Sequence, residues 1–375
     1  MTPSLMAFNV CRHRHNNIRD VCRWFGLCLS PSIAPDAAFA SLYGRYHPIH
    51  ERSMHSTSIL LASREYITES QPRSPAVRSI RLPSNTADQK LQLLSFYRFV
   101  PIDNPESIRD VLFERLKTIH GLRGTVYVAN EGINTQFAVP EDSLWELLNT
   151  FGKAGQCDGA VLPFDAFEKE APNMGNVVDE GVPTFDRLIV RTRDNILRDG
   201  IAPAEENNSV LDWTNNGVEL DAKDWDEQLR PLVNADENIQ LLDCRNSYES
   251  DQGTFVHSTP LDTQTFSETW DMLDEKVKSN SLDPSKPTFI FCTGGIRCVK
   301  VGAYLKQRLG FDDVRSLKHG IIGYQRWKNC EQQLDGTQDN SDRDESLWVG
   351  ENFLFDKRRF SNEGSDNTHE EDNKQ

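Results

Sequence analysis

Cys292 is the residue whose surroundings in the sequence point most directly to chemistry. It follows the apolar run 288–291 and opens the loop formed by Cys292, Thr293, Gly294, Gly295, Ile296 and Arg297. Two glycines let the backbone curl tightly, so that its N–H groups and the next helix N-terminus converge into an anion-binding nest. A thiol in that nest should have a lowered pKa, and the Arg297 guanidinium would add positive charge. We therefore predict that Cys292 and Arg297 are catalytic and that the sulfur carries negative charge.

The spacing of Cys292 and Arg297 favours sulfur chemistry over phosphate chemistry. Four residues separate them, one fewer than in the cysteine-based phosphatases, whose loop must enclose a phosphate group. A shorter loop fits a single sulfur atom better, as a thiolate or a persulfide.

Cys298, six residues after Cys292, has two interpretations. It is either a resolving thiol that pairs with Cys292 or a thiol packed as a small apolar side chain. No neighbouring Cys or His in the sequence completes a ligand set with this pair, so we predict no metal site.

A second polar loop follows the apolar run 239–242. Asp243, Arg245 and Glu249 are expected to form ion pairs that brace the active-site loops rather than to act in catalysis, and Cys244 is expected to be structural.

Apolar runs and helical patterns alternate from residue 223 to 331. Strands are expected at 239–243, 288–291 and 314–317, with helices between and after them. This alternation predicts a parallel, doubly wound α/β domain. Ligands bind beyond the carboxyl ends of the strands in such sheets, which is where Cys292 and Asp243 stand.

Residues 91–195 follow a different order. Strands are expected at 91–100, 124–129, 135–139 and 185–191, and helices at 105–119 and 141–151. The resulting β-α-β-β-α-β order predicts a ferredoxin-like module, a fold that does not by itself identify a function. Residues 196–222 are expected to be a linker with turns.

The two ends of the chain differ from its middle in charge. The first 90 residues carry 11 basic and 6 acidic side chains, and residues 331–375 carry 5 and 13, which leaves −13 of the total −16 on residues 91–330. We expect residues 1–88 to be a transit peptide or disordered leader that directs the chain to a mitochondrion or plastid, with the cytoplasm as the alternative. Residues 332–375 are expected to be a C-terminal extension, and its end, 361–375, is expected to be disordered. No apolar run approaches the roughly 20 residues that span a bilayer, so no membrane association is expected.

Several short motifs resemble the rhodanese-domain tRNA uridine hydroxylase family. They are the Cys292–Cys298 loop, 243–246, 248–249, 253–255 and 320–321 in the second domain, 97–102, 131–134 and 185–190 in the first, and 348–350 and 353–356 beyond. The resemblance implies a rhodanese-type fold for residues 223–331. It also implies oxygen-dependent formation of 5-hydroxyuridine at the tRNA wobble position. Transfer RNA would then be the partner and molecular oxygen the co-substrate, with no other cofactor evident.

This chain departs from that family in three ways. It ends without the cysteine-rich tail of many relatives, so no tail-bound metal is supported, and His319 stands where relatives often have glycine. The acidic middle is unusual for a tRNA-binding protein, since such affinity depends largely on neutralising phosphates. The candidate phosphate contacts are Arg98, Arg187, Arg191, Arg193, Arg326 and Lys328.

Two other functions remain open at this stage. In a sulfurtransferase, Cys292 would take sulfane sulfur from thiosulfate or a persulfide donor protein and pass it to an acceptor. The loop supports this equally well, and only the attached first module favours tRNA. A non-catalytic interaction protein is the third hypothesis, and the intact Cys292 and Arg297 argue against it.

Overall fold

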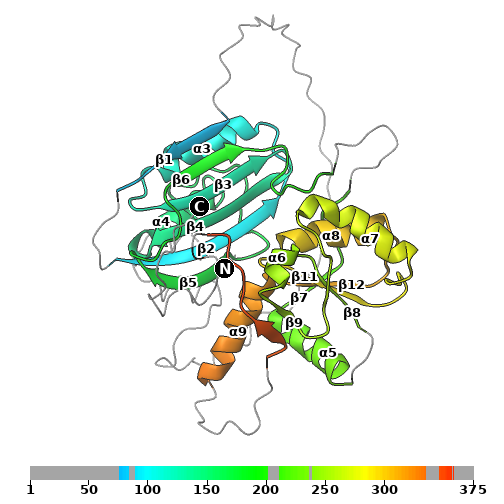
Figure 1. Ribbon diagram of the computed structural model, residues 1–375. Coiled ribbons are helices and arrows are strands. Elements are labelled where there is room, and N and C mark those ends of the chain that lie inside the picture. Colours follow the sequence, from blue (N-terminus) through cyan, green and yellow to red (C-terminus); the bar gives the residue numbers. More distant parts are fainter. Residues whose placement is uncertain are drawn as a thin grey trace, which may run out of the picture.

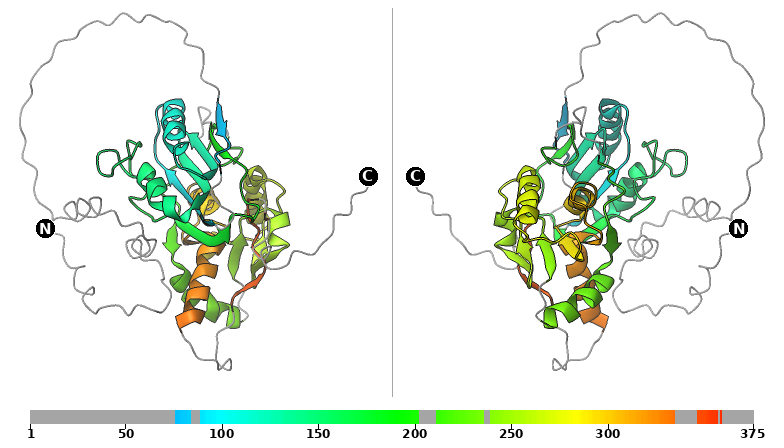
Figure 2. Two further views of the ribbon diagram at one scale, coloured as in Figure 1. Left: turned by 90° about the vertical axis from the view of Figure 1, so that its left-hand side faces the viewer. Right: turned by 90° about the vertical axis from the view of Figure 1, so that its right-hand side faces the viewer.

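The computed structural model describes residues 76–83, 89–201, 211–235, 239–334, 346–356 and 358, and it places two sheet-containing domains beside each other (Figures 1 and 2). The elements of the first domain are β1 (Val77–Ile80), β2 (Lys90–Phe99), α3 (Pro105–Leu116), β3 (Arg123–Ala129), β4 (Gly132–Pro140), a 3-10 turn (Glu141–Ser143), α4 (Leu144–Phe151), β5 (Asn173–Asp179) and β6 (Leu188–Thr192).

The first domain has the predicted ferredoxin-like core, built from β2, α3, β3, β4, α4 and β5. Its strands are antiparallel in the order β3-β4-β2-β5, and β6 and then β1 extend the β3 edge. The capping pattern before α3 is as expected, because the Asn104 side chain accepts a hydrogen bond from the Ser107 N–H at 2.9 Å and Pro105 is the first helical residue.

Two expectations for this domain were wrong. The fourth core strand is β5, which the sequence reading missed, and the run 185–191 instead supplies the added strand β6. Strand β5 has the sequence NMGNVVD, whose asparagines and glycine disfavour a strand on propensity alone. Strand β1 lies inside the segment 1–88 assigned to a leader, and only its antiparallel pairing with β6 identifies it. The rest of the leader before residue 76 lies outside the described residues.

Helices α3 and α4 cover one face of the first sheet. The buried core there includes Leu94, Phe96, Val126, Ile133 and Phe137 from the strands together with residues of both helices. Side chains alternate between the two faces of a strand, so the intervening residues face the opposite side, towards the second domain.

The second domain comprises β7 (Val218–Leu220), α5 (Ala222–Asn234), β8 (Gln240–Asp243), α6 (Ser247–Ser250), β9 (Gly253–Phe255), β10 (Thr259–Pro260), a 3-10 turn (Phe266–Glu268), α7 (Thr269–Lys278), β11 (Thr288–Phe291), α8 (Ile296–Gln307), β12 (Val314–Leu317) and α9 (Gly320–Leu334). Its sheet is parallel throughout, in the order β10-β8-β11-β12-β7. Apolar clusters on both faces confirm the doubly wound α/β prediction.

The boundaries of this domain differ from those expected. Strand β7 belongs to its sheet although it falls within the range 196–222 assigned to a linker. Beyond α9, β13 (Trp348–Gly350) pairs with β9, and Trp348 packs against Phe255. Residues 348–350 therefore pack on the body of the domain. The expected disordered tail, 361–375, lies outside the described residues. Within the described part of the chain, no helix is long and apolar enough to cross a membrane.

Candidate active site

Cys292 follows the last residue of β11 and is buried, with 1% of its surface exposed. Gly295 turns the loop into α8 with φ of 96°, and its N–H donates a hydrogen bond to Cys292 Sγ at 3.1 Å. Burial alone would raise the pKa of this thiol. A hydrogen bond from the Cys298 thiol, the charge of Arg297 and the N–H groups of residues 298 and 297 outweigh it and lower the pKa to about 5. Cys292 is thus a thiolate at neutral pH, as the loop sequence predicts.

Cys298 lies beside Cys292 in the first turn of α8 and is also buried. Burial and its hydrogen bonds with Cys244 and Cys292 raise its pKa well above the usual value for a thiol. Cys298 therefore stays protonated and donates to the Cys292 thiolate. Cys244, at the end of β8, completes a row of three buried thiols, all of them free.

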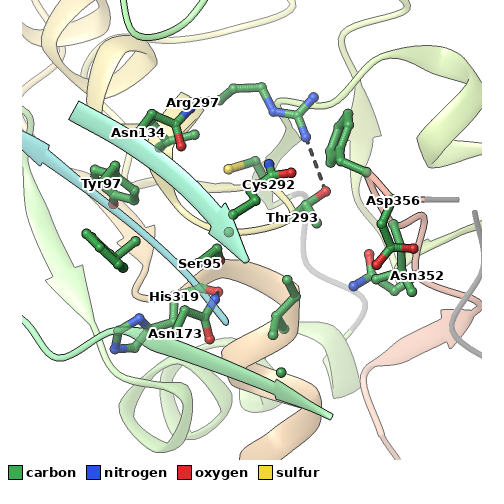
Figure 3. A pocket seen from close by; sticks show the side chains of 18 of the residues that line it. Ser95, Tyr97, Asn134, Asn173, Cys292, Thr293, Arg297, His319, Asn352 and Asp356 are labelled. Atoms are coloured by element: carbon green, nitrogen blue, oxygen red, sulfur yellow. Dashed lines mark hydrogen bonds between the residues drawn. The ribbon is translucent and has the colours of Figure 1, made fainter. Parts of the chain in front are cut away.

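Arg297 makes a two-pronged ion pair with Glu249. Its Nη1 and Nη2 lie 2.6 and 2.8 Å from the two carboxylate oxygens, and Nη2 also donates to Thr293 Oγ1 at 3.2 Å (dashed line in Figure 3). Although burial of Glu249 would raise its pKa, Arg297 and Arg245 lower it, so the pair is fully charged. Arg297 thus acts on Cys292 through its positive charge, while its hydrogen bonds to Glu249 and Thr293 hold the Cys292 loop in place.

The ion pairs predicted for Asp243, Arg245 and Glu249 form two separate interactions. Arg245 and Asp243 form a fully buried ion pair at 2.6 Å, and Arg245 Nη2 also donates to the Gly253 carbonyl at 2.5 Å. Glu249 receives only a backbone contact from Arg245, because its carboxylate is taken by Arg297. Asp243 and Arg245 therefore hold β8 to β9, and Glu249 holds the Cys292 loop.

A cavity of about 1420 Å³ opens in front of Cys292 between the two domains. Figure 3 shows Cys292, Thr293 and Arg297 of the second domain on one side of it and Ser95, Tyr97, Asn134 and Asn173 of the first domain on another. A further wall is formed by Asn352, Leu354, Phe355, Asp356 and Arg358, and the centre of the Phe355 ring lies 5.5 Å from the Arg297 guanidinium carbon.

The first domain presents to the cavity a continuous face of uncharged polar and aromatic side chains. Strand register places Tyr127, Asn134 and Tyr97 in one row, and Thr125, Gln136, Ser95 and Asn173 in the next. We call these seven residues the polar sheet face. These residues were not among those predicted from the sequence. The pattern that could have indicated them is the recurrence of polar residues at every second position of β2 and β4.

Hydrogen bonds hold two asparagine side chains of the polar sheet face in place. Asn134 Nδ2 donates to the Ile196 carbonyl and Asn173 Nδ2 to the His319 carbonyl, each at 3.1 Å. Asn173 Oδ1 is buried and accepts no hydrogen bond from the described residues.

His319 and Glu170 line the same cavity, with His319 Nδ1 3.3 Å from Glu170 Oε1. Burial and the charge of Glu219 raise the pKa of Glu170 to about 7, while burial and the charges of Arg326 and Lys318 lower that of His319 to about 4. The imidazole is therefore neutral at pH 7, so this contact is not an ion pair. The φ of 58° at His319 is one that glycine adopts freely.

Some, but not all, of the basic residues predicted to contact phosphates line this cavity. Of the predicted phosphate contacts, Arg193, Arg326 and Lys328 line it, whereas Arg98, Arg187 and Arg191 do not. Arg198 and Arg358 also line it and were not predicted. Among the described residues, no group of three or more His, Cys, Asp or Glu side chains could hold a metal ion.

Two protein-family models match the two domains of this chain. Residues 91–196 match the UPF0176 acylphosphatase like domain and residues 226–329 the rhodanese-like domain. A crystal structure of a rhodanese-like domain protein from Staphylococcus aureus is 20% identical, with a TM-score of 0.22, over 28% of this chain and 90% of that one.

Full-length relatives match both domains together. The tRNA uridine(34) hydroxylase of Legionella pneumophila (strain Corby) is 32% identical over 267 residues, 71% of this chain and 88% of the relative. The protein of that name from Leptospira interrogans is 30% identical over 265 residues, 71% of this chain and 62% of the relative. The chain therefore belongs to the tRNA uridine(34) hydroxylase family.

Proposed function

We propose that this protein hydroxylates C5 of uridine 34 in tRNA to give 5-hydroxyuridine, the activity that fits its relatives' name. The observation that carries the proposal is the polar sheet face opposite the Cys292 thiolate. Amides, hydroxyls and aromatic rings are the groups that read and stack a nucleobase removed from its strand. The cavity, at about 1420 Å³, has room for a nucleotide with its neighbours.

Arginine and lysine side chains near the cavity support an RNA substrate in spite of the acidic middle of the chain. Arg193, Arg198, Arg326, Lys328 and Arg358 line a cavity whose polar sheet face is uncharged. A local basic patch can neutralise the phosphates that flank the target nucleotide even when the net charge is negative.

The proposed reaction replaces the C5–H bond of uracil by C5–OH. With molecular oxygen as co-substrate, one oxygen atom enters the base, and the other leaves as water after taking up two protons and two electrons from an external two-electron reductant such as a dithiol. Cys292 would act as nucleophile or redox centre, and Cys298, the loop N–H groups and the charge of Arg297 would stabilise its thiolate.

The decisive experiment is deletion of the gene followed by mass spectrometry of digested tRNA. We expect 5-hydroxyuridine at position 34 to be lost on deletion, restored by the wild-type gene and not restored by Cys292→Ser. Unchanged 5-hydroxyuridine in the deletion strain would refute the proposal. Growth of the wild-type strain with and without oxygen tests the co-substrate, because cells grown without oxygen should also lack 5-hydroxyuridine.

Sulfur transfer is the second candidate, because the Cys292 nest would also stabilise a persulfide. Purified protein would then convert thiosulfate and cyanide to sulfite and thiocyanate, and Cys292→Ser would abolish this turnover. Absence of turnover by the wild type would count against this candidate without affecting the first.

For location, we propose import into a mitochondrion or plastid, supported by Arg12, Arg14 and Arg19 in a stretch of 19 residues without an acid. Because the relatives above are bacterial proteins, the cytoplasm is the alternative. A fluorescent protein fused behind residues 1–75, the part of the expected leader before β1, should enter an organelle, and a diffuse cytoplasmic signal would contradict import.

A further inference from the structure

Asn134 occupies a central place on the polar sheet face. Register pairs it with Tyr97 on β2 and with Tyr127 on β3, so an aromatic ring stands on each side of it. Tyr97 in turn lies against the Cys292 loop. Its hydroxyl is so close to Gly295 that a Cβ atom at that position would lie only 2.9 Å from the hydroxyl oxygen. Asn134 is thus one cross-strand neighbour away from the loop that holds the thiolate.

The amide of Asn134 cannot turn over freely. Its Nδ2 donates to the Ile196 carbonyl at 3.1 Å, and a flipped amide would place two acceptor oxygens against each other. Ile196 is itself fixed, because its N–H donates to Glu131 Oε1 at 2.8 Å. Glu131 is bound by Lys300 of α8, the helix that begins at the Cys292 loop. The orientation of Asn134 is therefore tied to the catalytic loop.

A fixed asparagine amide offers a defined pattern to a pyrimidine. One N–H is used by Ile196, which leaves a carbonyl oxygen and one N–H for a ligand. Uracil presents a ring N3–H donor beside the O4 acceptor and complements this pattern. Cytosine presents the reverse, an N3 acceptor beside an amino donor, and could bind only if the amide turned over.

We propose that Asn134 is the residue that selects uracil over cytosine in this cavity, by accepting from N3–H and donating to O4. C6 lies opposite N3 in the ring and C5 lies beside C4, so a base held through N3–H and O4 leaves both carbons free of contact with Asn134. Asn173 is less suited to this role, since its oxygen is enclosed. This inference rests on the proposed function.

The test compares binding of two tRNA transcripts that differ only in uridine or cytidine at position 34. The protein carries Cys292→Ser, so that binding is measured without turnover. A fixed hydrogen-bonding pair should favour uridine by roughly ten- to a hundred-fold. Adding Asn134→Ala should bring that ratio close to one. Asn134→Asp should lower it too, because a carboxylate accepts from either base and lacks the N–H held by Ile196, and it covers the case in which the alanine variant fails to fold.

Asn130→Ala is the matched control, since Asn130 also donates its amide to a backbone carbonyl, that of Ile102 at 2.9 Å, but does not line the cavity. It should leave the uridine preference unchanged. A preference that survives both Asn134 substitutions, or that falls equally with Asn130→Ala, would overturn the inference and leave the proposed function standing. Equal binding of the two transcripts by the Cys292→Ser protein would instead contradict uridine recognition altogether.

Discussion

At the scale of single residues, the state of Cys292 depends on its neighbours more than on its burial. Burial would raise the pKa of the thiol, and the hydrogen bond from the Cys298 thiol is the largest of the effects that oppose it, ahead of the charge of Arg297. Cys298 can serve as this donor because burial and its own contacts raise its pKa. The two thiols therefore have different states at the same pH.

We predict that Cys298→Ala raises the pKa of Cys292, whereas Cys298→Ser, which keeps a donor, changes it less. A thiolate forms above its pKa, so alkylation of wild-type Cys292 by iodoacetamide should reach half its maximal rate near pH 5 and fall below that pH. In the alanine variant this midpoint should move to higher pH. Peptide mass spectrometry separates Cys292 from the other cysteines, and an unchanged midpoint in Cys298→Ala would show that Cys298 does not tune it.

At the scale of elements, one buried lysine joins the two domains. Lys300 of α8 is fully buried, and its ammonium binds both oxygens of Glu131 at 2.8 Å and pairs with Asp199. It also lies 4.6 Å from the centre of the Trp213 ring. Glu131 belongs to the turn between β3 and β4, so this cluster fixes the polar sheet face relative to the Cys292 loop.

We predict that Lys300→Met destabilises the protein by about 3–5 kcal/mol, because the buried carboxylate of Asp199 and the partly buried one of Glu131 would remain without their cation. Urea denaturation would measure this. Lys306→Met, six residues further along the same helix and without such a cluster, should cost far less. A loss below about 1 kcal/mol for Lys300→Met would mean that water reaches and solvates the carboxylates, contrary to the burial seen here.

In the whole molecule, the two domains enclose a cavity lined by several basic side chains, although the net charge of the chain is −16. The cavity wall contributed by β2, β3, β4 and β5 is uncharged, while Arg193, Arg198 and Lys328 are among the basic residues that line the rest. The Arg193 guanidinium carbon lies 5.2 Å from the centre of the Tyr127 ring, beside Asn134. A phosphate next to the bound base would meet these groups first.

We predict that Arg193→Ala weakens tRNA binding and reduces the slope of log K against log salt concentration by about one unit, as expected for one lost phosphate contact. Arg187→Ala serves as the control, because Arg187 is exposed and does not line the cavity. Titrations at several salt concentrations would show the effect, and equal slopes for the two variants would argue against a phosphate contact at Arg193.

Features that depend on neighbours along the chain could be predicted from the amino-acid sequence. The Cys292 loop, the cap and first proline of α3, and the alternation of β8, β11 and β12 with helices all arise from contacts within a few residues. A lowered pKa for Cys292 was predictable for the same reason, since Gly295, Arg297 and Cys298 follow it in one turn.

Features that depend on strand register and on contact between the domains could not be predicted in this way, because they arise only when distant segments fold together. Strands β1, β5 and β7 are short or polar, and they form because a neighbouring strand offers hydrogen bonds. Glu249 pairs with Arg297, 48 residues away, and Lys300 with Glu131, 169 residues away. The sequence pattern of the polar sheet face is typical of the solvent-exposed side of a sheet. It becomes the wall of a site because the second domain places a thiolate opposite it, and no local pattern encodes that placement.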